Sequence, residues 1–117
     1  MIDHRRLLHL QSALTKSGGR HDIQDVIHNL ENGHAQIWET EHSTIVTQVV
    51  DYDTYRSLNI WLAGGEVDDI VELLEEGEEW ARMCGCSVVE VTGRRGWKRV
   101  LAPFGFREEA VVLTKDS

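Results

Sequence analysis

The chain has 117 residues, of which 41% are hydrophobic and 27% charged, and 20 acidic residues against 12 basic ones give a formal net charge of −8. This size suits one domain with a single modest core, and the acidic balance argues against direct nucleic-acid binding, which needs a dense cationic surface. No apolar run approaches the roughly 18 residues of a membrane-spanning helix, so we expect no membrane span.

The first residues do not form a secretory signal. Early basic residues are present, but the stretch from Leu7 to Leu14 is interrupted by His9, Gln11 and Ser12. A signal peptide needs an uninterrupted apolar block, so we expect no export by that route.

The residues that most often bind metals are few or poorly spaced. Cys84 and Cys86 are the only cysteines, too close in sequence for an ordinary structural disulfide and without a second pair to complete a zinc site. The six histidines show no HExxH or other ligand spacing. We therefore expect reduced thiols and no metal site.

Two helices are predicted before the first strand. Leucines at helical spacing favour a helix over residues 3–15, within an N-terminal helical segment of about residues 1–19. Asp22 can cap a second helix from Ile23 to Glu31, which Asn32 and Gly33 would end because glycine tolerates the left-handed conformation.

Three strands should follow as an antiparallel meander. Ala35 to Glu39 is short, Ser43 to Val50 is rich in β-branched residues, and Tyr55 to Ala63 comes after a polar turn. Short connections between neighbouring strands favour antiparallel pairing.

The order of elements changes in the second half. Asp68 to Met83 reads as a helix whose apolar stripe would contain Ile70, Val71, Leu74, Ala81 and Cys84, with Leu73 and Trp80 beside it. A strand from Ser87 to Thr92, a helix from Gly93 to Ala102 with Trp97, Val100 and Leu101 inward, and a last strand from Ala110 to Thr114 complete the chain. We predict one α+β (mixed α/β) domain over residues 1–117.

This order resembles the GNAT acetyltransferase fold, a mostly antiparallel sheet flanked by helices. The resemblance covers roughly Ile23 to Lys115. Glu78 to Cys86 is similar to the end of the family's central helix, and Phe104 to Arg107 resembles its LGF turn. The segments LNIWLAGG and GRRGWKRVL are similar to small GNAT-like proteins encoded among bacteriophage and prophage structural genes.

The resemblance implies a cofactor site from which this sequence departs. In active members, a turn with the pattern Arg/Gln-x-x-Gly-x-Gly/Ala binds the acetyl-CoA pyrophosphate, and it falls here on Gly65 to Ile70. Both motif glycines are replaced by larger side chains, although glycine lets the backbone approach phosphates. Glu66, Asp68 and Asp69 would repel the phosphates, each by on the order of several kcal/mol at an effective dielectric of about 20.

Two further family positions differ. The usual tyrosine general acid aligns with Leu101, which has no proton to donate, and a frequent asparagine aligns with Arg94. If acetyl-CoA binds nevertheless, its contacts would come from Gly64, Gly65, Glu66, Val67, Arg94 and Arg95. A carboxylate such as Glu66 or Asp68 would then have to act as the base for the acceptor amine.

The segment from Gly64 to Glu79 holds eight carboxylates and no Lys or Arg. In a purely structural interpretation, Asp68 and Asp69 favour the helix dipole and the later acids form a solvated face. Alternatively, the acids repel one another and attract a basic partner. The candidate partner-binding residues are Glu72, Glu75, Glu76, Glu79, Lys98 and Arg99.

These departures favour a non-catalytic, phage-type GNAT-fold protein that makes protein–protein contacts in or around a virion, as an internal or ejection-associated protein. The expected location is a virion or the host cytoplasm, with phage structural proteins as partners and a homo-oligomer left open. The alternative is a divergent acetyl-CoA-dependent N-acetyltransferase. A third hypothesis is a regulatory module whose acidic helix mimics nucleic-acid charge.

Overall fold

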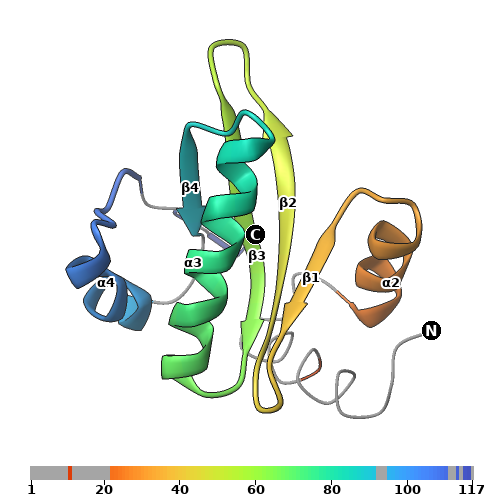
Figure 1. Cartoon of the computed structure of the whole chain (residues 1–117), viewed down its shortest axis with the longest axis horizontal. Helices are drawn as coiled ribbons and strands as arrows, with labels where there is room; N and C mark the ends of the chain where they lie inside the picture. Colours follow the sequence, from red (N-terminus) through yellow and green to blue (C-terminus); the bar gives the residue numbers. More distant parts are fainter. Residues whose placement is uncertain (1–10, 12–21, 92–94, 111–112, 114, 117) are drawn as a thin grey trace.

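A computed structural model describes residues 11, 22–91, 95–110, 113 and 115–116. Its sheet has four strands in the order β1-β2-β3-β4 (Figure 1). The strands are β1 (Gln36–Glu39), β2 (Thr44–Asp51), β3 (Arg56–Gly64) and β4 (Val88–Val91). The first three are antiparallel neighbours, so the predicted meander is confirmed, and β4 runs parallel to β3.

Within residues 22–91 and 95–110, three helices and one 3₁₀ turn accompany the sheet: α2 (Ile23–Glu31), α3 (Val67–Met83), α4 (Arg95–Leu101) and η1 (Ala102–Phe104). The predicted start of α2 is confirmed, because the Asp22 carboxylate accepts the Asp25 N–H at 2.9 Å. Its predicted end is confirmed as well, since Gly33 follows with φ +73°. In the described part of the chain, no helix has the length and apolar character needed to cross a bilayer.

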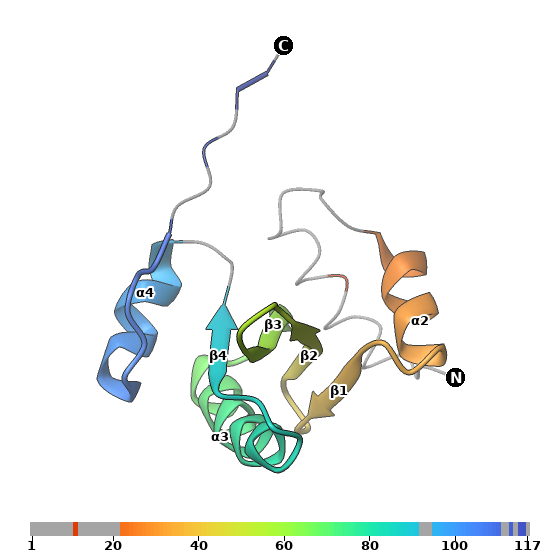
Figure 2. The same cartoon turned by 90° about the horizontal axis from the view of Figure 1, so that it is seen from above.

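The sheet separates two apolar clusters. The larger lies between the sheet, α3 and α4, and the smaller lies between the sheet and α2 on the opposite face (Figure 2). The buried members of the larger cluster are Ile45, Leu58, Ile60, Ile70, Leu73, Leu74, Ala81, Cys86 and Leu101. Those of the smaller cluster are Val26, Ala35, Val46 and Leu62. The sheet therefore has apolar contacts on both faces.

A bulge at Trp61 reverses the alternation of side chains along β3. Thr47 pairs with Ile60 and the adjacent Val46 pairs with Leu62, so β3 carries one extra residue. Before the bulge, Ile60 faces the α3 cluster, and after it Leu62 faces the α2 cluster. Ile60 and Leu62, which would share one face of a regular strand, therefore pack into the two different clusters.

Two predictions about the second half need correction. The buried face of α3 contains Gly77 together with Ile70, Leu73, Leu74 and Ala81, whereas Val71 is half-buried. Cys84 is not part of the helical stripe, because it caps the helix C-terminus. Gly77 is on the inner face because Trp38 of β1 packs across it, edge-on to Trp80 at 5.6 Å.

The ends of the chain are described only in part. The helix predicted over residues 3–15 lies outside the described residues, apart from the helical Gln11. Ala110 and Leu113, the described residues of the predicted last strand, are not in a strand. The inward positions predicted for Trp97, Val100 and Leu101 are confirmed, since all three belong to the larger cluster or pack against it.

Candidate functional site

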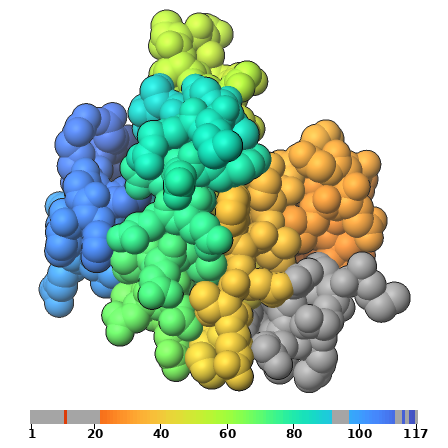
Figure 3. All heavy atoms as spheres, in the orientation of Figure 1, coloured from red at the N-terminus to blue at the C-terminus, as the bar shows by residue number. Residues whose placement is uncertain are grey.

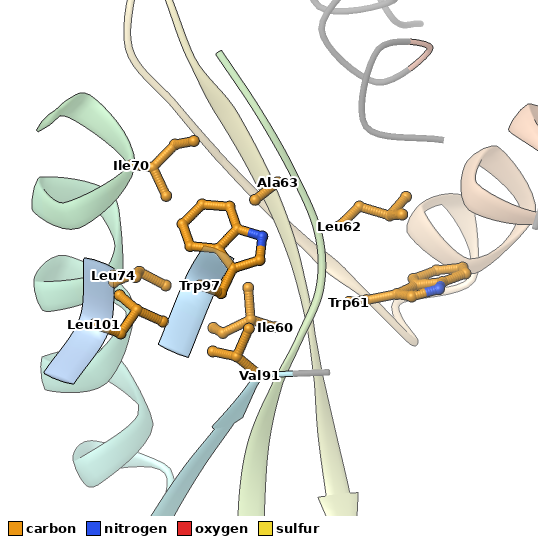
Figure 4. A pocket seen from close by; sticks show the side chains of 9 residues that line it. All are labelled: Ile60, Trp61, Leu62, Ala63, Ile70, Leu74, Val91, Trp97 and Leu101. Atoms are coloured by element: carbon orange, nitrogen blue, oxygen red, sulfur yellow. The ribbon is translucent and has the colours of Figure 1, made fainter. Parts of the chain in front are cut away.

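The candidate site lies beside the last part of β3. The last described pair between β3 and β4 joins Ile60 to Val91, and β3 continues to Gly64. The space beyond the last pair is a hollow bounded by β3, β4, α3 and α4 (Figure 4). We call it the β3–α3 hollow; it is lined by Ile60, Trp61, Leu62, Ala63, Ile70, Leu74, Val91, Trp97 and Leu101.

Side chains already fill most of the hollow. The Trp97 indole reaches from α4 into the space between Ala63 of β3 and Ile70 of α3, and Ile60 and Leu74 lie below it (Figure 4). Trp61 and Leu62 point the other way, toward α2. The open volume that remains is about 30 Å³, which is room for roughly two water molecules, since each needs about 10–15 Å³ of such a cavity.

The turn from β3 to α3 is tied to β2 through the buried Ser43. The Glu66 N–H donates to Ser43 Oγ at 2.8 Å, and the same hydroxyl donates to the Glu66 carbonyl at 3.2 Å. Gly65, which precedes Glu66, has φ +118°, and it lies so close to the His42 carbonyl and Ser43 that a Cβ would clash with both. The Glu66 amide therefore already has an acceptor within the protein.

A second contact fixes the first turn of α3. The Thr40 hydroxyl donates to Asp69 Oδ2 at 3.0 Å and accepts the Ser43 N–H at 3.1 Å. The N-cap residue of α3 is Glu66, and its side chain makes no capping hydrogen bond. The first amides of α3 therefore lie beside the Glu66, Asp68 and Asp69 carboxyl groups, where the helix dipole favours negative charge.

The structure brings some of the predicted cofactor contacts together. Gly64 is buried at the end of β3, and the exposed Gly65, Glu66 and Val67 follow directly. At the two glycine positions of the family motif, Asp68 is exposed and Ile70 is 2% exposed within the core. Because Ile70 lines the hollow, its side chain takes up room that a glycine would leave open.

The other predicted contacts come from α4 and the segment before it. Arg94 lies outside the described residues, and Arg95 begins α4. Leu101, at the position of the family's tyrosine acid, is 3% exposed in the hollow wall. An aliphatic side chain there cannot give a proton to a leaving thiolate.

The candidate partner-binding residues form two exposed groups. Glu72, Glu75, Glu76 and Glu79 are all exposed along α3. Lys98 and Arg99 are exposed on α4, and Lys98 lies 3.6 Å from Glu108. The four glutamates therefore face solvent, as both the structural and the partner-binding interpretations require.

Sequence reasoning missed the two side chains that shape the site most. It identified Trp97 only as an inward residue and gave Ser43 no role. The sequence offers no local signal that Ser43, 23 residues before Glu66, would contact this turn. Such a contact depends on which strand becomes the neighbour of β3.

Cys86 and Arg56 do not line the β3–α3 hollow. Cys86 is 8% exposed, and burial raises the pKa of its thiol although the nearby Arg56 charge opposes this. Arg56 itself donates to Asp51 Oδ1 and to the Cys84 carbonyl, each at 2.6 Å. Among the residues that the structure describes, no group of three His, Cys, Asp or Glu side chains could hold a metal ion.

No family model and no curated protein matches the sequence. Solved structures do match it: a transcriptional regulator from Bacillus halodurans has a TM-score of 0.71 at 12% identity, covering 97% of this chain and 92% of that one. A predicted acetyltransferase from Clostridium acetobutylicum, solved with acetyl-CoA, has a TM-score of 0.68 at 15% identity, covering 94% and 88%. For an acetyltransferase from Trypanosoma brucei the TM-score is 0.63 at 13% identity, with 94% of both chains covered. The chain therefore has the GNAT fold, and the predicted fold class is confirmed.

Proposed function

We propose that this chain is a GNAT-fold protein that acts through protein–protein contacts and does not transfer acetyl groups. The observation that carries the proposal is the Trp97 indole in the β3–α3 hollow, which leaves about 30 Å³ of open volume. An acetyl-pantetheine arm has many more atoms than the roughly two water molecules that this volume admits. Binding acetyl-CoA there would require Trp97 to move out of its packing.

The turn before α3 supports the same proposal. The Glu66 amide donates to Ser43 and is not directed at a ligand, while the exposed Asp68 and the buried Ile70 replace the small side chains that let phosphates approach. In addition, Leu101 supplies no general acid. Space, anion binding and proton donation are thus all unfavourable to acetyl transfer.

For the role in or around a virion, the support is the resemblance of LNIWLAGG and GRRGWKRVL to phage-encoded GNAT-like proteins. Under this proposal, the exposed glutamates of α3 and the exposed Lys98 and Arg99 of α4 are candidate contacts with phage structural proteins. The protein would then be found in virions or in the host cytoplasm. Purified virions, probed by mass spectrometry, would test that placement.

Calorimetric titration of the full chain with acetyl-CoA tests the proposal directly. We expect no saturable heat up to millimolar ligand, and micromolar binding would overturn the proposal. Trp97→Ala is the matched variant: if the indole alone blocks the hollow, this variant gains weak binding that the native chain lacks. If native chain and variant bind equally, Trp97 is not the obstacle.

One observation favours the alternative of a divergent N-acetyltransferase. No Glu66 side-chain cap covers the start of α3, where a ligand could approach the first amides of the helix. The similar Clostridium acetobutylicum structure contains acetyl-CoA. Release of CoA thiol above the buffer blank, measured over a panel of amines, would establish this alternative.

A further inference from the structure

The β2–β3 hairpin extends beyond the rest of the molecule (Figures 1 and 3). Its loop spans residues 52–55 and is closed by the Tyr52 N–H, which donates to the Tyr55 carbonyl at 2.9 Å. All residues from Asp51 to Arg56 are exposed. The tip is therefore accessible to a partner without any rearrangement of the fold.

Two tyrosines occupy this tip. The Tyr52 and Tyr55 rings stack with centroids 4.8 Å apart and planes 22° from parallel, yet the residues are 47% and 39% exposed. Neither belongs to an apolar cluster of the core. The backbone hydrogen bond and the Asp51–Arg56 ion pair already close the hairpin. Exposed aromatic side chains of this kind are typical of contact sites rather than of folding.

The surroundings of the rings are acidic. The Tyr55 hydroxyl donates to Glu90 Oε1 of β4 at 3.3 Å. The pKa of Tyr55 is raised, first by partial desolvation and then by the negative charge of Glu90, with a smaller contribution from Glu109. Asp53 lies in the loop itself, and Arg56, which begins β3, is already bound to Asp51.

We propose that this tyrosine tip, made of Tyr52, Asp53, Tyr55 and Glu90, docks a cationic segment of a partner protein. Arginine or lysine side chains are attracted to the faces of aromatic rings, and the Glu90 carboxylate offers a charge-assisted hydrogen bond at the ring edge. A nucleic acid would also stack on tyrosines, but these carboxylates repel its phosphates. The charge of the tip therefore selects a basic protein segment.

The proposal relies on the proposed function only in taking a protein as the partner, and the tip uses none of the residues of the β3–α3 hollow. Acetyl-CoA turnover would overturn the proposed function and leave peptide binding at the tip intact. Conversely, absence of peptide binding would overturn the tip proposal and leave the acetyl-CoA result unchanged.

The test is an NMR titration of the ¹⁵N-labelled full chain with the synthetic peptide Gly-Arg-Gly-Arg-Gly. We expect saturable shifts of the amides of residues 51–57 and 88–91, and no such shifts with the peptide in which citrulline replaces arginine. Tyr52→Leu with Tyr55→Leu keeps apolar side chains on the hairpin but removes both rings. This variant should bind at least about tenfold more weakly.

Two further variants separate a specific site from general charge attraction. Glu90→Gln, which removes one charge without altering the hairpin, should also weaken binding. Neutralising the earlier part of the α3 face with Glu72→Gln, Glu75→Gln and Glu76→Gln should change the affinity by no more than about twofold, because these residues lie about two or more helical turns before Cys84, where the end of α3 contacts Arg56. Shifts confined to α3, or equal affinity of the native chain and the double leucine variant, would overturn the proposal. Melting curves of each variant verify that it is folded.

Discussion

Gly65→Ala should destabilise the protein through the turn that joins β3 to α3. Gly65 has φ +118°, which side chains rarely adopt, and an added Cβ would press on the His42 carbonyl and Ser43 Oγ and lie 2.6 Å from the Ser43 Cα. Backbone atoms cannot yield as a flexible side chain would. The substitution therefore forces the turn to move away from β2.

The magnitude follows from two contributions. A non-glycine residue in this backbone conformation costs roughly 1–2 kcal/mol. Moving the turn also breaks both hydrogen bonds between Ser43 and Glu66, and leaving a buried hydroxyl unpaired costs about 1–3 kcal/mol. We expect a total loss of about 3 kcal/mol in the free energy of unfolding.

Gly33→Ala is the matched control. Gly33 also has a positive φ, +73°, but no atom lies within 4 Å of its added Cβ. Gly33→Ala should therefore lower the free energy of unfolding only by the conformational contribution, roughly 1–2 kcal/mol. Urea denaturation followed by circular dichroism measures both values, with unchanged m-values as the sign of two-state unfolding. Equal losses at Gly65 and Gly33 would refute the reasoning from the close approach.

Three other predictions concern stability and reactivity. Ser43→Ala should lower the free energy of unfolding by about 1–3 kcal/mol, whereas Ser57→Ala should leave it unchanged or raise it slightly. Both residues are fully buried, but Ser57 Oγ has no hydrogen-bond partner in the described structure. Equal losses in urea denaturation would contradict this. Gly77→Ala should raise the free energy of unfolding by roughly 0.5–1 kcal/mol, since alanine favours the helix and its Cβ would make ordinary contacts at 3.7 and 3.8 Å; a lower melting temperature would show that the face is too tight. Iodoacetamide at pH 8.5 should alkylate Cys84 before Cys86, because burial raises the pKa of the Cys86 thiol and keeps it protonated until the pH passes that raised value; peptide mass mapping over pH 7–10 would reveal the opposite order if the reasoning is wrong.

Local patterns were enough to predict most of the elements. Asp22 and Gly33 mark the two ends of α2 by their own backbone and side-chain chemistry, so the predicted bounds match the observed ones. The strands of the meander follow from β-branched runs and short turns. Helix α3 was also found, because its apolar spacing extends over 17 residues.

Features that depend on distant neighbours were not predicted. The stripe of α3 was misplaced at Val71 and Cys84 because the position of Gly77 is set by Trp38, a residue of another element. In the site, the resemblance pointed to the turn after β3, while the contact with Ser43 emerged only from the pairing of β2 with β3. Periodicity within one segment carries no information about such pairings.

The part of β3 that follows the bulge at Trp61 is sensitive to its length as well as to its composition. Deleting Trp61 itself would pair Ile60 with Thr47 and Leu62 with Val46 without a bulge, so Leu62 and Ala63 would keep their faces. An insertion or deletion between Leu62 and Gly65 would instead move the later residues to the opposite face and shift Gly65 out of step with Ser43, which directly precedes β2. Substitution or deletion of Trp61 should therefore be tolerated better than an insertion or deletion between Leu62 and Gly65. Natural variants of this protein should keep that spacing even where the residues within it differ.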